Sequence, residues 1–301
     1  MKRSPRIGIA LGSGSARGWA HVGVLRALAR EGIEPSIISG CSIGAFVGAV
    51  AAAGDLEKLG GWVESLGWQE VVGLMDMGLR GGLIKGDKLV SFFERNFVDR
   101  DFTALQHSFG CVATDLLNGH EVWLRDGSVS AAVRASIALP GLLTPLSYDG
   151  RLLVDGGLVN PVPVSLARAM GADVVIAVDL NSDLVGRAWR TPLEPTVPEP
   201  SASSWSGKLL ARFTRNGNGG QEIEDSEAIP SMLTVMQSSI SIMSARIARS
   251  RLAGEPADVL VSPRLAQLGL MDYHRGAEAI AEGEAAVEVA MPAIRRALGG
   301  T

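Results

Sequence analysis

The 301-residue sequence has little cysteine, little histidine and no concentration of positive charge. Its two cysteines, Cys41 and Cys111, favour a reducing compartment and buried free thiols over a disulfide-bonded secreted fold. The formal net charge is -4, and no block rich in Lys and Arg interrupts the chain. Because nothing in it would attract a polyanion, we expect no nucleic-acid partner.

Long hydrophobic runs are also lacking. The apolar run near the beginning, Ile7 to Leu11, is too short for the core of a signal peptide. The uncharged stretch 35–54 contains Pro35 and several glycines, which favours a strand, a turn and a buried helix over a membrane-spanning helix. We therefore expect a cytoplasmic protein whose contact with a membrane is peripheral, at the inner face.

Short apolar runs alternate with helical periodicity along the chain, which predicts an α/β fold with a mostly parallel central sheet flanked by helices. The Asn118-Gly119 dipeptide favours a tight hairpin turn between two of the strands. The expected strands are residues 6–11, 36–39, 111–117, 121–124, 152–154, 173–180 and 259–261. The expected helices are residues 21–30, 43–53, 162–170, 231–252 and 275–298.

We expect one domain over residues 1–301, with a core of about 6–180 plus 231–298. A mostly helical insert is expected at 62–97, and a mobile excursion at 186–229, where Pro, Ser and Gly accumulate. The insert carries flexible apolar side chains at Leu74, Met75, Met77 and Leu79. They fit either the core of a subdomain or a lipid-facing cap.

The motif G-x-S-x-G occurs at residues 40–44, between a predicted strand and a predicted helix. Ser42 is either a nucleophile on a strand-to-helix turn or a small residue that the turn requires. A serine nucleophile needs a base, and the chain offers His21, His107, His120 and His274. Only His274 follows the candidate acids, as the serine, acid, histidine order of α/β-hydrolases demands. Asp155, at a strand end before two glycines, is the better candidate, although an aspartate in an ordinary turn shows the same pattern.

A glycine-rich loop, Gly12-Ser13-Gly14, follows the first predicted strand. A dinucleotide site would need a third glycine where Arg17 stands and an acidic residue after the second strand. A phosphate loop would need Gly-Lys followed by Ser or Thr, so we expect no nucleotide partner. The loop offers backbone N–H groups beside a helix N-terminus, which suits an oxyanion.

The stretches ALGSGSARGWAHVGVLRAL, ISGCSIGAFVGA, GGLIKGDKL and VRASIALPGLLTPLSYDGRLLVDGGLVNPVP together resemble the patatin-like phospholipase family. This family includes plant patatins and the catalytic domain of neuropathy target esterase. The resemblance implies a three-layer fold and a Ser-Asp dyad in which Ser42 is the nucleophile and Asp155 its sole partner. It implies an oxyanion hole around Gly12, Gly14 and Ser15, and no histidine, cofactor or metal. Many relatives have consecutive glycines in this loop, where this chain has Ser13 and Ser15, and Arg17 matches the family's basic residue as a loop-organising donor.

The favoured function is a serine acyl hydrolase that cleaves phospholipids, lysophospholipids or other fatty-acyl esters through an acyl-enzyme at Ser42. An α/β-hydrolase-like Ser-Asp-His esterase that uses His274 is the first alternative. The second is a lipid-binding regulatory scaffold with negligible turnover.

Overall fold

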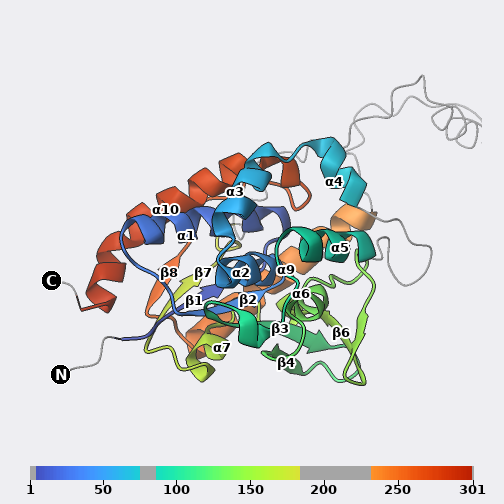
Figure 1. Cartoon of the computed structure of the whole chain (residues 1–301), viewed down its shortest axis with the longest axis horizontal. Coiled ribbons are helices and arrows are strands. Elements are labelled where there is room, and N and C mark those ends of the chain that lie inside the picture. The colour runs from blue at the N-terminus through green and yellow to red at the C-terminus, as the bar shows by residue number, and fades with distance from the viewer. Residues whose placement is uncertain (1–4, 75–85, 184–231, 300–301) are drawn as a thin grey trace, which may run out of the picture.

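The computed structural model describes residues 5–74, 86–183 and 232–299, and it has a central β-sheet with helices on both faces (Figure 1). The strands are β1 (Ile7–Leu11), β2 (Ile37–Cys41), β3 (Ser108–Asp115), β4 (Glu121–Leu124), β5 (Leu146–Tyr148), β6 (Arg151–Asp155), β7 (Val174–Val178) and β8 (Val259–Val261). Their order is β5-β6-β3-β2-β1-β7-β8, and β4 pairs with β3. The five strands from β3 to β8 in this order are mutually parallel, which confirms the expected mostly parallel sheet.

Helices cover the two faces of the sheet because side chains alternate along each strand. Ile9 and Leu11 of β1 belong to the larger apolar cluster, with α1, α2 and α10, whereas Ala10 belongs to a second cluster with α7 and α9. The described helices are α1 (Ala20–Arg30), α2 (Ile43–Ala53), α3 (Leu56–Ser65), α4 (Trp68–Leu74), α5 (Asp87–Asn96), α6 (Val129–Ser136), α7 (Val164–Ala169), α9 (Met232–Gly254) and α10 (Gly276–Ala297). Short 3₁₀ turns include η1 (Ser15–Trp19), η3 (Gly156–Leu158) and η4 (Tyr273–Arg275).

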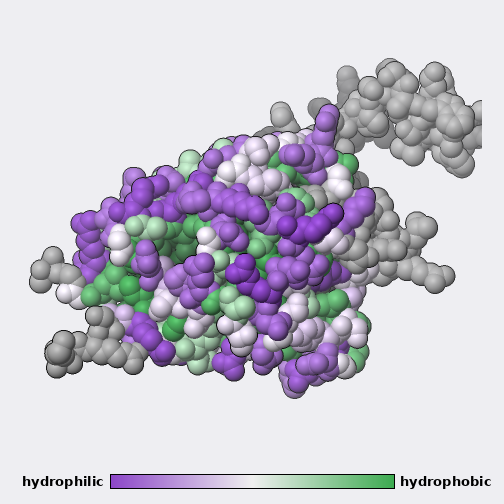
Figure 2. All heavy atoms as spheres, viewed as in Figure 1, coloured by the Kyte–Doolittle hydropathy of each residue, from purple (hydrophilic) through white to green (hydrophobic). Residues whose placement is uncertain are grey.

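The final helix, α10, is amphipathic, and its buried residues recur at helical spacing (Ala279, Ile280, Gly283, Val287, Met291 and Ile294). It lies along α1 on the upper side of the molecule in Figure 1, and its outward surface is mostly hydrophilic in Figure 2. In the part of the chain that the structure describes, no helix combines the length and the apolar character needed to cross a membrane.

The turn between β2 and α2 is tight because both glycines of the G-x-S-x-G motif lack a side chain. A Cβ atom on Gly40 would collide with the backbone of Ala45, and one on Gly44 would collide with the carbonyl group of Leu11. These contacts let the end of β1 and the beginning of α2 approach each other closely. Ser42 is the residue at the apex of this turn, immediately before α2.

Two strands meet end to end along one edge of β3. Cys41 of β2 pairs with Val112, and Asp155 of β6 pairs with the next residue, Ala113. Because β4 pairs with β3 over both positions, β4 occupies the opposite edge, and β2 and β6 share the remaining one. β2 runs parallel to β3 and β6 antiparallel, so the carboxyl ends of the two strands point toward each other.

Most of the expected elements are found, with ends that differ by a few residues. The predicted hairpin forms between β3 and β4, with Gly119 at a φ of 72°, and α2 ends at Gly54 as expected. Helix α6 and strand β5 were not anticipated from the sequence. The expected insert at 62–97 includes α4, α5 and only the end of α3, which begins at Leu56. The predicted excursion at 186–229 and the residues Met75, Met77 and Leu79 lie outside the described residues.

Candidate active site

The strongest feature of the site is the contact between Ser42 and Asp155. The Ser42 hydroxyl donates a hydrogen bond of 2.6 Å to Oδ2 of Asp155. The two residues are 113 positions apart in the sequence and meet because β2 and β6 end at the same point along β3. A hydroxyl bonded directly to a carboxylate is the arrangement that a serine nucleophile with an aspartate base requires.

Both oxygens of the Asp155 carboxyl group accept a hydrogen bond. Its second oxygen, Oδ1, accepts a hydrogen bond of 2.7 Å from the N–H of Gly157, and the side chain is only 2% exposed. Burial raises the pKa of Asp155 from 3.8 to about 6, although the hydrogen bonds from Ser42 and Gly157 oppose this rise. A base with a pKa near the working pH accepts a proton far more readily than an exposed aspartate.

Ser42 has a strained backbone, with φ 56° and ψ −123°, in a region that residues with a side chain rarely adopt. Its N–H donates a 2.9 Å hydrogen bond to Oγ of Ser136. The Ser136 hydroxyl in turn donates to the carbonyl oxygen of Val112 at 2.7 Å. Ser136 is the last residue of α6, and it supports the turn that carries Ser42 through this hydrogen bond. Neither this helix nor Ser136 was identified from the sequence.

The glycine-rich loop presents two unbonded N–H groups to the site. Four neighbouring N–H groups are occupied: Gly12 donates to Val178 O (3.0 Å), Ser13 to Pro161 O (2.8 Å), Ala16 to Leu270 O (3.2 Å) and Arg17 to Gly14 O (3.3 Å). Those of Gly14 and Ser15 have no partner among the described residues, and both residues line one cavity with Ser42. Of the residues expected to form an oxyanion hole, Gly14 and Ser15 line the cavity and have N–H groups without a partner among the described residues. Gly12 does not line the cavity, and its N–H is bonded to Val178.

A third donor was missed from the sequence. Ile43 follows Ser42, lines the same cavity and begins α2, so its N–H has no partner within the helix. The N–H of the residue after the nucleophile is a usual oxyanion donor on such a turn, and the G-x-S-x-G spacing could have identified it.

Two buried side chains hold the loop from behind. His21 lies in α1, and its Nε2 donates a 2.7 Å hydrogen bond to the carbonyl oxygen of Gly12. Burial lowers the pKa of His21 to about 4, so the ring is neutral. Nε of Arg17 donates to the carbonyl oxygen of Leu268 at 2.8 Å. Arg17 is therefore tied to the scaffold and does not line the cavity, in keeping with a loop-organising role.

The remaining histidines and the cysteines lie elsewhere. His274 is exposed, and its ring packs edge-on against Trp68, with centroids 5.4 Å apart. Like His107 and His120, it is not among the residues that line the cavity. Cys41 and Cys111 are free and buried, as expected, and burial raises the pKa of both thiols, so neither is a reactive thiolate.

An open apolar cavity leads to Ser42. Its lining is mostly aliphatic and aromatic. Asp155 is the one charged side chain among the described residues that line it. The apolar walls come from several segments, including Trp19, Ile43, Phe46, Leu142, Ile240 and Met271. Such a lining suits a hydrocarbon chain with its reacting end beside Ser42.

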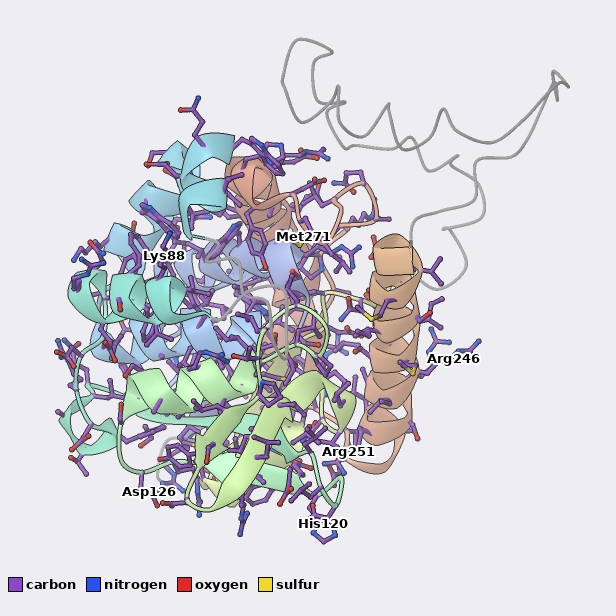
Figure 3. The ribbon with its side chains drawn as sticks, turned by 90° about the vertical axis from the view of Figure 1, so that its right-hand side faces the viewer. Lys88, His120, Asp126, Arg246, Arg251 and Met271 are labelled. Carbon is purple, nitrogen blue, oxygen red and sulfur yellow. The ribbon has the colours of Figure 1, made fainter. Side chains whose placement is uncertain are left out.

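One wall of the cavity is α9, to which Ile240, Ser241 and Ser244 belong. In Figure 3 this helix stands along one side of the molecule, and Arg246 points away from the body. Near the C-terminus of α9, Arg251 forms a 2.7 Å ion pair with Glu121 of β4. This pair anchors α9 to the sheet at a distance from the reacting groups.

A family model described as patatin-like phospholipase matches residues 9–168, more than half of the chain. The chain belongs to the patatin-like phospholipase family. This assignment confirms the resemblance inferred from the motifs and, at the level of the family, indicates a lipid ester hydrolase. The matched segment contains Ser42, Asp155 and the glycine-rich loop, but not α9 or the segment before α10.

Two proteins of similar sequence agree with this assignment. An uncharacterized NTE family protein of Mycobacterium tuberculosis is 34% identical over 96% of this chain and 92% of its own length. Patatin-like phospholipase domain-containing protein 7 of Mus musculus is 38% identical over 58% of this chain, which corresponds to 14% of the mouse protein. The crystal structure of VipD from Legionella pneumophila aligns with a TM-score of 0.49 and 13% identity, covering 93% of this chain and 75% of VipD.

Within the described ranges, no group of three or more His, Cys, Asp or Glu side chains is arranged to hold a metal ion.

Proposed function

We propose that this patatin-like protein is a serine acyl hydrolase that works through a Ser42–Asp155 dyad. The observation that carries the proposal is the 2.6 Å hydrogen bond from Ser42 to a buried carboxylate at the bottom of an apolar cavity. The rise in the pKa of Asp155 to about 6 supports its role as a base near neutral pH.

In the proposed mechanism, Oγ of Ser42 attacks the ester carbonyl carbon while Asp155 takes the hydroxyl proton. The carbonyl oxygen becomes an oxyanion, which the N–H groups of Gly14, Ser15 and Ile43 stabilise. When the tetrahedral intermediate collapses, Asp155 returns the proton to the leaving alcohol and an acyl-Ser42 ester remains. Asp155 then takes a proton from a water molecule, which attacks the acyl carbon. When the bond to Ser42 breaks, Asp155 returns this proton to Oγ, and the fatty acid leaves.

The substrate class follows from the cavity and from the family. Its apolar lining favours a fatty-acyl chain, so we infer that the substrate is a phospholipid, a lysophospholipid or a related fatty-acyl ester. We further propose a cytoplasmic protein that meets its lipid by peripheral contact with the inner membrane face. Neither a nucleotide nor a nucleic acid has a part in this proposal.

The decisive experiment combines a fluorophosphonate probe with hydrolysis of a short-chain chromogenic ester. The wild-type protein should hydrolyse the ester and gain one probe adduct on Ser42, located by mass spectrometry of its peptides. Ser42→Ala should lose both properties, whereas the control Ser239→Ala, at an exposed serine of α9, should keep both. A folded wild-type protein that neither hydrolyses esters nor binds the probe would contradict the proposal and favour the lipid-binding scaffold.

A further inference from the structure

A segment far along the chain holds the glycine-rich loop in place. We name residues 268–273, between β8 and α10, the tether. Besides the bond from Arg17, four hydrogen bonds join the tether to the loop and η1. The carbonyl oxygen of Leu270 accepts from Ser15 Oγ (2.6 Å) and from Ala16 N (3.2 Å), and that of Tyr273 accepts from Trp19 Nε1 (3.2 Å). The fourth joins Ser15 Oγ and Tyr273 Oη (2.8 Å). The tether lies beyond the segment that the family model matches.

Ser15 needs this support because its backbone is in the left-handed region, with φ 53°. Glycine adopts that conformation freely, but a residue with a Cβ atom is strained there. The side chain of Ser15 compensates through its two contacts with the tether. Its single hydroxyl hydrogen is donated to the carbonyl oxygen of Leu270, so the Tyr273 hydroxyl must donate to Ser15 Oγ.

Tyr273 is itself well fixed. Its ring packs edge-on against Trp19, with centroids 6.0 Å apart, and its carbonyl oxygen accepts from the Trp19 indole. Its hydroxyl therefore approaches Ser15 from a rigid position. The Ser15 conformation it supports directs one of the two unbonded N–H groups of the loop.

We propose that Tyr273 is a positioning residue that, through Ser15, fixes an oxyanion donor of the site. The proposal rests on the acyl hydrolase function proposed above. It explains how a loop with serine at position 15 keeps a backbone conformation that suits glycine. Tyr273 also lines the cavity, and the proposal assigns its effect on the reaction to the hydrogen bond with Ser15.

The first test is Tyr273→Phe, which keeps the ring and removes the hydroxyl. Loss of one neutral hydrogen bond should lower kcat for a soluble short-chain ester about three- to tenfold, because the oxyanion donor is less well oriented. KM should change by less than about twofold, since an oxyanion donor acts mainly on the transition state. The control is Tyr148→Phe, at the other tyrosine of the chain, which should leave kcat unchanged.

The second test compares two substitutions of Ser15 and then combines one of them with Tyr273→Phe. Ser15→Ala keeps the strain and loses both side-chain bonds, so its kcat should fall further than that of Ser15→Gly, in which the strain is absent. In the Ser15→Gly protein the Tyr273 hydroxyl has lost its acceptor. Tyr273→Phe should then change kcat by less than about twofold, a clear departure from additivity.

Three outcomes would overturn the inference: an unchanged kcat in Tyr273→Phe, an equal loss in the Ser15→Gly background, or a change confined to KM, which would indicate substrate contact. Melting temperatures of all variants separate misfolding from misorientation. If the wild-type protein is active and labelled at Ser42 while one of these outcomes holds, only the role of Tyr273 is refuted. If the wild-type protein has no activity and no label, the proposed function falls and the inference with it.

Discussion

The raised pKa of Asp155 should make both the activity and the stability of the protein depend on pH. The variant Asp155→Asn tests both effects. As a base, Asp155 must be deprotonated, so activity should rise with pH through about 6. Between pH 5 and 8 the rate for a soluble ester at low concentration should increase about tenfold, because the deprotonated fraction rises by that factor. Asp155→Asn should abolish turnover at every pH, since an amide cannot accept the serine proton.

Stability should change in the opposite direction. Because the pKa of Asp155 in the folded protein lies above its ordinary value of 3.8, the folded state binds more protons than the unfolded state between pH 3.8 and about 6. The free energy of unfolding therefore falls as pH rises through this window, and the full cost of the buried charge is present above it. A difference of one unit between the folded and unfolded pKa corresponds to about 1.4 kcal/mol. The charged carboxylate therefore lowers the free energy of unfolding by roughly 3 kcal/mol above this window.

The amide introduced by Asp155→Asn carries no charge, so this variant should be more stable than the wild-type protein at pH 8. That advantage should shrink by about 1.4 kcal/mol between pH 8 and pH 5, as the wild-type carboxyl group becomes protonated. Denaturant unfolding of both proteins at the two pH values measures it. A wild-type rate that is flat from pH 5 to 8, or a stability advantage of Asp155→Asn that does not vary with pH, would refute the assignment of a buried base.

Two further predictions concern residues around the dyad. Ser136→Ala removes the acceptor of the Ser42 N–H, so kcat should fall about tenfold, with a lower melting temperature, because a strained turn loses its support; an unchanged kcat would mean that the turn holds Ser42 without it. His274→Ala should keep most of the activity, because the imidazole is exposed and packs against Trp68 rather than lining the cavity; an inactive but folded variant would restore the Ser-Asp-His alternative.

Local signals in the sequence were sufficient for the elements that carry the nucleophile. The apolar run before residue 42, the small residues after it and Gly54 predicted β2, the sharp turn and the length of α2, because these features depend on contacts between near neighbours. The glycines of the motif have the same local origin. The family resemblance then predicted Asp155 as the partner of Ser42, a role that the pattern around Asp155 left open.

Tertiary structure decided the rest, because those contacts join residues that are far apart in the chain. The sequence contains no sign that β2 and β6 end at adjacent positions on the same edge of β3, yet that register brings Ser42 to Asp155. The sequence also does not show which loop N–H groups remain unbonded, since their partners include Val178, Pro161 and Leu270. Burial, which only the packed core provides, raises the pKa of Asp155 to about 6, as its proposed role as a base requires.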